Sequence, residues 1–202
     1  MQVVRLLVCL VMLLGLSTVS AQKFSMETWH RGFLVSVERD TIRGKIKYDI
    51  PNNVVLVSRN EVVQTFTSQK TFYFEIFDEI VGNYRQFYAL PYNVNFDYEL
   101  PIFFEVLYEG PLSLLTREAI VTEVVNASGA YYSMPVQREV VSYAYFFLDK
   151  KGNIRRFSGN KKDLYLIMSN KQAQVKSFVK KNRLNTNDLR DLIRITAFYN
   201  SL

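Results

Sequence analysis

The segment Phe33-Leu34-Val35-Ser36-Val37-Glu38-Arg39-Asp40-Thr41-Ile42-Arg43-Gly44-Lys45-Ile46-Lys47-Tyr48 decides the fold class that we predict for this chain of 202 residues. Apolar side chains recur at every second position on both sides of Arg39-Asp40, and polar or charged side chains fill many of the positions between them. This period of two is typical of a β-strand with one buried face, and Arg39-Asp40 provides a turn. The segment therefore predicts a two-stranded antiparallel hairpin.

Further strands are predicted between this hairpin and Phe157, because apolar and β-branched residues continue to alternate with polar ones. The aromatic share of 14% comes mostly from Tyr and Phe, which also favours a sheet over helices. The clearest of these segments are Val54–Val57, Val62–Phe66, Phe72–Phe77, Tyr84–Leu90, Ile102–Tyr108, Val140–Leu148 and Ile154–Phe157.

Two segments of this region are less regular. Pro91–Pro101 contains two prolines and two asparagines, and it is predicted to be a loop. Leu112–Val125 is rich in β-branched residues and fits one bent strand or two, whereas a helix through Leu114–Val121 is the competing interpretation.

The hydrophobic period becomes helical after Ser158, which predicts two or three short helices. Ser158 or Asn160 is the expected cap of the first helix, the second begins near Asn170, and Thr186 or Asn187 caps the third. Strands followed by helices predict an α+β fold with segregated parts. We expect a mainly antiparallel β-sandwich or barrel-like body, residues 22–157, and a basic helical tail, residues 158–202, packed on that body.

The first 21 residues have the pattern of a secretory signal peptide. Arg5 supplies a positive charge, Leu6–Leu16 is an apolar run, and Val19-Ser20-Ala21 is a small-residue cleavage pattern. A transmembrane anchor is the alternative, but the run is well short of the ~20 residues that span a bilayer. We therefore predict an exported protein, periplasmic or associated with the outer membrane, without a transmembrane helix after signal removal. Cys9 lies in this segment, so the mature chain is expected to contain no cysteine and no disulfide.

The residue inventory excludes several catalytic chemistries for the mature chain. With His30 as the only histidine and no cysteine, thiol catalysis is excluded and a zinc or iron site is not expected. The glycines form no phosphate-binding loop and no nucleophile elbow. We therefore assign no catalytic residue, no cofactor-binding residue, no metal ligand and no cofactor.

Carboxylates leave one enzymatic alternative open. Glu105 and Glu109 flank an apolar segment, and Glu75, Asp78 and Glu79 cluster near its neighbour. A glycosidase needs two carboxyl groups about 5 to 10 Å apart in a cleft. A hydrolase of an envelope polymer is therefore the alternative to a binding protein, and solvated acids at strand edges are the structural alternative to both.

Charge divides the mature chain into two unequal parts. Residues 22–149 hold 11 basic and 16 acidic residues, whereas residues 150–202 hold 13 basic and 3 acidic residues. Lys176, Lys180 and Arg183 have the spacing of one helical face and are the candidate contacts with an anionic surface. A solvated face, or one that complements the acidic body, is the alternative. Because the chain is predicted to be exported, we expect no nucleic-acid partner.

Several segments resemble uncharacterised exported proteins of the Bacteroidota. They are Trp29-His30-Arg31-Gly32, Asp40-Thr41-Ile42-Arg43-Gly44-Lys45-Ile46-Lys47-Tyr48, Phe103-Phe104-Glu105-Val106-Leu107 with Glu109-Gly110, and Ile195-Thr196-Ala197-Phe198-Tyr199-Asn200. The resemblance implies a Gram-negative envelope location and transfers no site residue. The function expected from the sequence is therefore a non-enzymatic envelope protein that binds another envelope component, either a protein or an anionic polymer.

Overall fold

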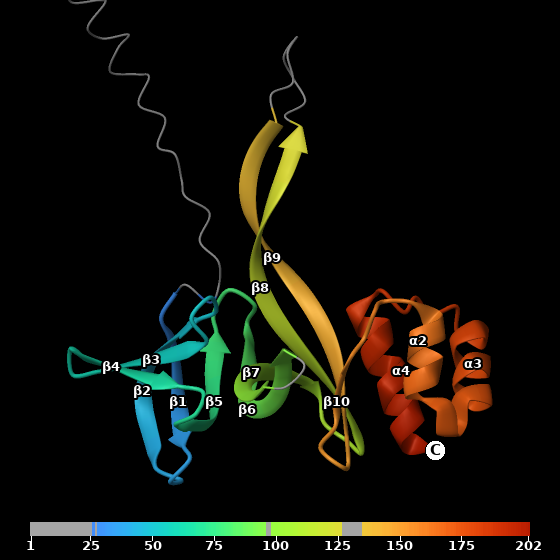
Figure 1. Cartoon of the computed structure of the whole chain (residues 1–202), viewed down its shortest axis with the longest axis horizontal. Coiled ribbons are helices and arrows are strands. Elements are labelled where there is room, and N and C mark those ends of the chain that lie inside the picture. Colours follow the sequence, from blue (N-terminus) through green and yellow to red (C-terminus); the bar gives the residue numbers. More distant parts are fainter. Residues whose placement is uncertain (1–25, 27, 96–97, 127–134) are drawn as a thin grey trace, which may run out of the picture.

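The computed structural model describes residues 26, 28–95, 98–126 and 135–202, so the predicted signal peptide lies outside the described residues. The described residues form ten strands, three α-helices and a short 3-10 helix (Figure 1). The strands are β1 (His30–Ser36), β2 (Thr41–Asp49), β3 (Val54–Arg59), β4 (Val62–Thr67), β5 (Thr71–Asp78), β6 (Asn83–Asn95), β7 (Tyr98–Tyr108), β8 (Leu112–Asn126), β9 (Pro135–Asp149) and β10 (Ile154–Arg156). The helices are α2 (Lys161–Ile167), η2 (Ser169–Lys171), α3 (Gln172–Lys181) and α4 (Leu189–Ser201). The predicted α+β class, with an antiparallel sheet followed by short C-terminal helices, is confirmed.

All ten strands belong to one antiparallel sheet with the order β10-β9-β8-β7-β6-β5-β1-β2-β3-β4. The predicted hairpin around Arg39-Asp40 is β1–β2, with Leu34 paired to Ile42. Only β1 interrupts the sequential order, because it lies between β5 and β2. This insertion joins the first two hairpins to the rest of the sheet.

The sheet curls so that its β2–β3 end contacts β7, four strands away in the sheet order. Tyr48 of β2 packs edge-on against Phe103 of β7, with 5.5 Å between the ring centroids. Asn53, in the β2–β3 turn, accepts a hydrogen bond from the backbone N–H of Phe103 at 3.2 Å. The enclosed apolar core is built from β1–β3 and β5–β7 and includes Leu34, Ile46, Val55, Phe74, Ile76, Phe87 and Phe103. Alternating inward residues therefore fill a curled, barrel-like half of the molecule.

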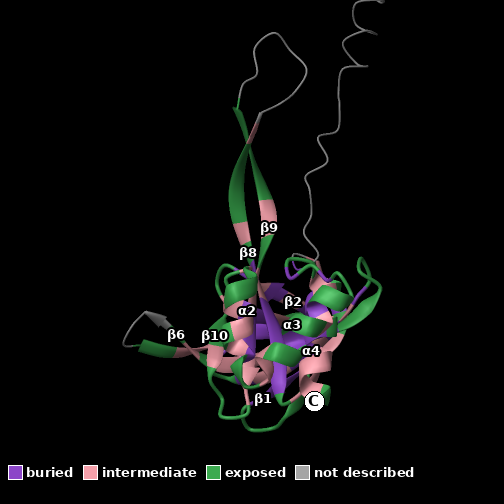
Figure 2. Cartoon of the chain, turned by 90° about the vertical axis from the view of Figure 1, so that its right-hand side faces the viewer, coloured by how far each residue is buried: buried purple, intermediate pink, exposed green. Residues whose placement is uncertain are grey.

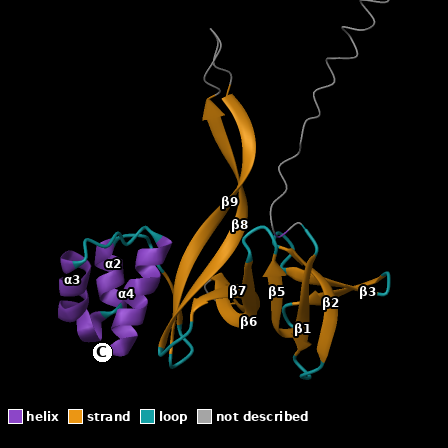
Figure 3. Cartoon of the chain, turned by 180° about the vertical axis from the view of Figure 1, so that it is seen from behind, coloured by secondary structure: helices purple, strands orange, loops and turns teal. Residues whose placement is uncertain are grey.

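The helices pack on the other end of the sheet, beside β8, β9 and β10 (Figure 3). The second core contains Leu114, Phe147, Leu164, Met168, Val175, Val179, Leu192 and Ile195. Asn200 of α4 also bonds the backbone of Leu112 twice, as acceptor from its N–H and donor to its C=O, both at 2.9 Å. The tail is thus attached through its apolar faces and one side-chain clamp.

The helix caps agree in part with the sequence prediction. Asn160 caps α2 by accepting a hydrogen bond from the N–H of Asp163 at 2.8 Å, as expected. The prediction of Thr186 or Asn187 as the third cap is wrong, because Asp188 caps α4 and accepts from the N–H of Asp191 at 3.0 Å. Polar residues stand at all three positions, so the sequence did not distinguish among them.

The prediction of a loop at Pro91–Pro101 is wrong for its described residues. β6 extends to Asn95 and β7 begins at Tyr98, with Pro91 paired directly to Pro101. At this level the β5–β6 ladder has already ended and the β7–β8 ladder has not begun. Each proline therefore lies on an edge, where a missing N–H costs no ladder hydrogen bond to a further strand.

The segment Leu112–Asn126 is one long strand, which rejects the helical interpretation of Leu114–Val121. Beyond Thr116 it pairs with β9 alone among the described residues, from Arg117–Ala144 to Asn126–Pro135. We call these two paired segments, residues 117–126 and 135–144, the ribbon. It projects from the body as a twisted pair of strands (Figure 1). The sequence also predicts a loop from Asn126 to Pro135; these two residues form the last pair of the ribbon, and the residues between them lie outside the described ones.

Candidate functional site

A groove lies between the sheet and α4 at the base of the ribbon. Its volume is about 530 Å³, and its walls include Tyr143, Tyr145, Leu189 and Ile193. Arg85, Glu105 and Glu118 also line it, so charged groups from three neighbouring strands meet apolar and aromatic walls. Among the described residues, this combination of a groove and convergent charges is the best candidate for a small-molecule or side-chain site.

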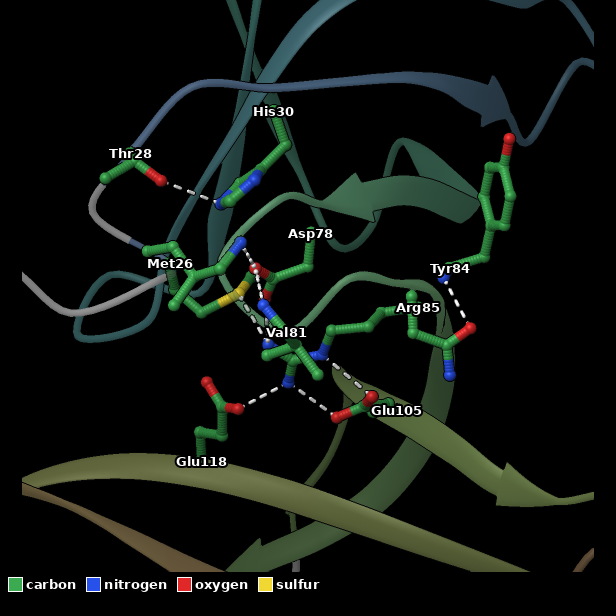
Figure 4. A network of polar contacts seen from close by, with 11 residues as sticks. Met26, Thr28, His30, Asp78, Val81, Tyr84, Arg85, Glu105 and Glu118 are labelled. Atoms are coloured by element: carbon green, nitrogen blue, oxygen red, sulfur yellow. Dashed lines mark hydrogen bonds and ion pairs between the residues drawn. The ribbon is translucent and has the colours of Figure 1, made fainter.

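The charged part of the groove is an ion cluster centred on Arg85 of β6 (Figure 4). Its guanidinium donates to both oxygens of Glu105, from Nε at 2.8 Å and from Nη2 at 2.6 Å. Nη2 also donates to Oε1 of Glu118, and Nη1 donates to Oδ2 of Asp78 at 3.2 Å. Three carboxylates from β5, β7 and β8 thus share one guanidinium, which is a planar fork suited to such contacts.

The charged side chains of this cluster are almost completely shielded from water. The side chains of Asp78, Arg85, Glu105 and Glu118 are between 0% and 11% exposed. Burial raises the pKa of Glu118, Arg85 lowers it, and the net direction is upward because Glu105 and Asp78 also repel a further negative charge. Burial lowers the pKa of Arg85, but its contacts with Glu105 and Glu118 outweigh burial and raise that pKa overall. Arg85 therefore stays charged, and Glu118 takes up a proton more readily than a solvated glutamate does.

Backbone hydrogen bonds fix the position of Asp78 in the cluster. Oδ1 of Asp78 accepts the N–H groups of Ile80 and Val81, at 3.0 and 3.2 Å, in the turn that leads into β6. Asp78 therefore orders the turn with one oxygen and bonds Arg85 with the other. The Nη1 group of Arg85 also donates a hydrogen bond to Sδ of Met26 at 3.2 Å.

His30, the histidine of the sequence inventory, lies near this cluster. It is buried, and its Nε2 lies 2.9 Å from the hydroxyl of Thr28 (Figure 4). No group of three or more potential metal ligands occurs among the described residues. The surroundings of His30 are those of a hydrogen-bonded core side chain.

The acids proposed from the sequence separate into two groups. Asp78 and Glu105 belong to the cluster, whereas Glu109 is exposed and Glu79 forms an exposed ion pair with Arg31. Glu75 accepts a hydrogen bond from Gln86 at 2.6 Å. Sequence reasoning therefore found two of the three clustered acids and missed both Glu118 and Arg85.

A period-two signal exists in the sequence for one of the two missed residues, Arg85. Arg85 shares a strand face with buried Phe87, as Glu105 does with buried Phe103. Charges at inward positions of successive strands predict a buried ion cluster, because an isolated buried charge is too costly. Glu118 carries no such signal, because its strand was ambiguous between a strand and a helix.

The predicted anionic-surface residues lie on the helical tail, away from the groove. Lys176 and Lys180 are exposed on α3. Arg183 is exposed beyond the end of α3, with a positive φ of 52°, so its place follows the C-terminal turn rather than the helical face. Lys176 also lies over the ring of Tyr165, 5.2 Å from its centroid.

The comparisons with known proteins give no match. No family model, no curated protein and no solved structure matches the chain. No helix among the described residues is long and apolar enough to cross a bilayer.

Proposed function

We propose that the protein is a non-enzymatic exported protein of the cell envelope and that it binds an anionic envelope component through its basic helical tail. The proposal rests on the sequence pattern of residues 1–21 for export and on the charge arrangement of the tail for binding. The observation that supports binding is that each acidic side chain of the tail caps a helix or pairs with a basic residue in or next to the tail.

The three acids of residues 158–202 each have a local structural role. Asp188 caps α4, Asp191 pairs with Arg194, and Asp163 pairs with Arg155 at the end of the sheet. Among the described residues, no ion pair links a basic side chain of the tail to an acid of the body. The tail therefore docks through its apolar core, and its positive charge faces solvent.

An outward positive face attracts polyanions over a distance set by ionic strength. Such attraction contributes about 1 kcal/mol for each Lys or Arg near an anionic surface and falls off within a Debye length of about 8 Å at 0.15 M salt. Lys176, Lys180 and Arg183 together therefore supply roughly 3 kcal/mol, or about a 100-fold change in affinity. Binding of this kind is strongly salt-dependent.

The test is a triple variant, Lys176→Glu, Lys180→Glu and Arg183→Glu, in the mature chain. We expect its binding to vesicles containing anionic lipid, and to anionic polymer from the envelope, to fall by roughly 100-fold or more at low salt. The thermal midpoint should change little, because the three side chains are exposed.

A matched control carries the same change in charge on the body. Lys45→Glu, Arg59→Glu and Lys70→Glu also reverse three exposed basic residues, in or next to the strands of the curled half. This control should retain most of the binding. Equal loss in both triple variants would show that net charge alone drives binding, which contradicts a site on the tail.

The hydrolase alternative is supported by the position of Glu105 and Glu118 in one groove. Against it, both carboxylates bond the same guanidinium, so each is held in an ion pair with Arg85. Incubation with purified envelope polymers separates the two functions. Turnover that disappears in Glu105→Gln would establish the enzyme and reject the binding proposal.

Export has a separate test. Protein isolated from the envelope of its native host should begin at Gln22, within about two residues of the predicted cleavage pattern. An intact Met1 on protein recovered from the cytosol would contradict the proposed location, whatever the tail binds.

A further inference from the structure

The ribbon exposes apolar surface on a part of the molecule that has little support from the body. Its ten residue pairs, from Arg117–Ala144 to Asn126–Pro135, have no third strand among the described residues. At about 3.3 Å per residue, ten residues extend roughly 33 Å. Isolated two-stranded hairpins of this kind are marginally stable in water. Beyond Glu118, which is buried at its base, Figure 2 shows the described residues of the ribbon as exposed or half-buried, in contrast to the buried centre of the body.

Both faces of the ribbon carry apolar residues, but they differ in how their charged residues are paired. One face, which we call the valine face, carries Val121 opposite Val140 and Val125 opposite Val136. Between these two pairs lies Glu123 opposite Arg138, with 3.6 Å between their charged groups. Val121 is 39% exposed and Val136 is 48% exposed, so the face presents apolar surface around one ion pair.

The opposite face lacks this arrangement. There Thr122 is paired with Glu139 and Val124 with Gln137, and nearer the body Glu118 turns into the groove toward Arg85. On this face Glu139 has no basic residue opposite it. Two copies of the face packed together would therefore leave Glu139 without an opposite charge.

We propose that the valine face is the contact surface of a homodimer, in which two ribbons pack face to face about a two-fold axis parallel to their length. This symmetry places β8 of one protomer over β9 of its partner. Glu123 then lies over the partner's Arg138, Val121 over the partner's Val140, and Val125 over the partner's Val136. The four charges alternate in sign around the centre of the contact, and valines surround them on both sides.

The positions of Glu123 and Arg138 favour a second copy of the chain as the partner, and they favour this symmetry. A two-fold axis across the ribbon would instead place Glu123 over the partner's Glu123, which is a like-charge contact. Only half of the ribbon's side chains belong to the valine face. The number of residues that each protomer contributes is therefore below the roughly 20–30 residues per side of a standard interface. The dimer should therefore be reversible, with dissociation on dilution.

The experiment uses two charge variants of the mature chain, alone and mixed. Glu123→Arg leaves arginine at both charged positions of the valine face, and Arg138→Glu leaves glutamate at both. We expect the native chain to sediment as a dimer at ~10 μM and above, where weak interfaces of this size associate. Each variant alone should be a monomer, and an equimolar mixture should form a 1:1 heterodimer, because every cross-ribbon charge contact is then complementary.

The mixture separates an interface from a defect within the ribbon. Both variants break the ion pair inside their own ribbon, so a merely structural effect predicts no recovery on mixing. Glu139→Arg is the matched control, since it reverses an exposed charge on the opposite face and should leave the dimer intact.

Three results would overturn the proposal. They are a native chain that stays monomeric across this concentration range, single variants that remain dimeric, and a mixture without heterodimer. A monomer whose ribbon variants instead lose binding to vesicles or to another envelope protein would assign the valine face to that partner. Failure of the triple tail variant leaves the dimer unaffected, because Lys176, Lys180 and Arg183 lie outside the ribbon.

Discussion

Replacing Arg85 by methionine should remove much of the stability of the fold. The guanidinium is the common partner of Asp78, Glu105 and Glu118, and its side chain is only 9% exposed. Removing one partner of a buried ion pair costs about 3–5 kcal/mol, because the other charge is left without compensation. Three carboxylates lose their partner in Arg85→Met, so we expect a loss near the upper end, about 4–5 kcal/mol at pH 7.

The matched variant is Glu118→Gln, which keeps an oxygen near Arg85 and removes one of the two excess negative charges. We expect its free energy of unfolding at pH 7 to stay within about 1 kcal/mol of the native value or to rise, because the pKa of Glu118 is already raised in the fold. Arg85→Lys, which keeps the charge but loses the planar fork, should fall between the two.

The pH dependence follows from the direction of the Glu118 pKa. Because that pKa is raised above its ordinary value of 4.5, the folded protein holds the proton more tightly than the unfolded chain. This contribution to stability is fully present below pH 4.5 and is lost as the pH rises through the folded pKa. The corresponding slope should disappear in Glu118→Gln. In Arg85→Met the deficit should shrink as the pH falls, since protonation relieves the buried carboxylates.

Urea unfolding followed by circular dichroism measures these differences, and thermal unfolding should show Arg85→Met roughly 10–20 °C below the native midpoint. Because domains are stable by only about 5–15 kcal/mol, this variant sits near the limit of folding, and Arg85→Lys keeps the comparison measurable. A loss below about 1 kcal/mol in Arg85→Met, typical of a surface ion pair, would refute the reasoning. So would a Glu118→Gln variant as unstable as Arg85→Met.

Two further predictions concern the contacts that close the fold. Asn53→Ala should destabilise by about 1–3 kcal/mol in urea unfolding, because it removes the bond to the N–H of Phe103 and places alanine at a φ of 52°; Asn53→Gly should recover the part due to backbone strain. Asn200→Ala should cost a similar ~1–3 kcal/mol and raise amide exchange at Leu112, because both backbone groups of that residue lose their partner. A change below about 0.5 kcal/mol at either site would show that water replaces the asparagine.

The fold class could be predicted from the sequence because period two and period 3.6 occupy separate parts of the chain. The β1–β2 hairpin and the cap of α2 by Asn160 are local features, set by residues within a few positions of one another. The strand identity of Pro91 and Pro101 was not predictable in this way. It depends on where the neighbouring ladders end, which is a property of the whole sheet.

The candidate site was less predictable than the fold for the same physical reason. Asp78 and Glu105 were visible as acids near apolar strands, but their convergence on Arg85 depends on the register of four adjacent strands. Lys176 and Lys180 were predictable as a helical face because their spacing is local. Arg183 fits the same spacing in the sequence but is not part of the helix, since α3 ends at Lys181.

The ion cluster also attaches the base of the ribbon to the body. The ladder between β7 and β8 ends at Thr116, and Glu118 is the next residue of β8 on the same face. Its bond to Arg85 therefore ties the base of the ribbon to β6 beyond the last backbone pair. Apolar contacts at this point would hold the ribbon without fixing its direction, whereas a planar guanidinium shared by three carboxylates accepts few arrangements. Buried ion pairs often contribute little net stability. The main structural effect of this one is to restrict the angle at which the ribbon leaves the body.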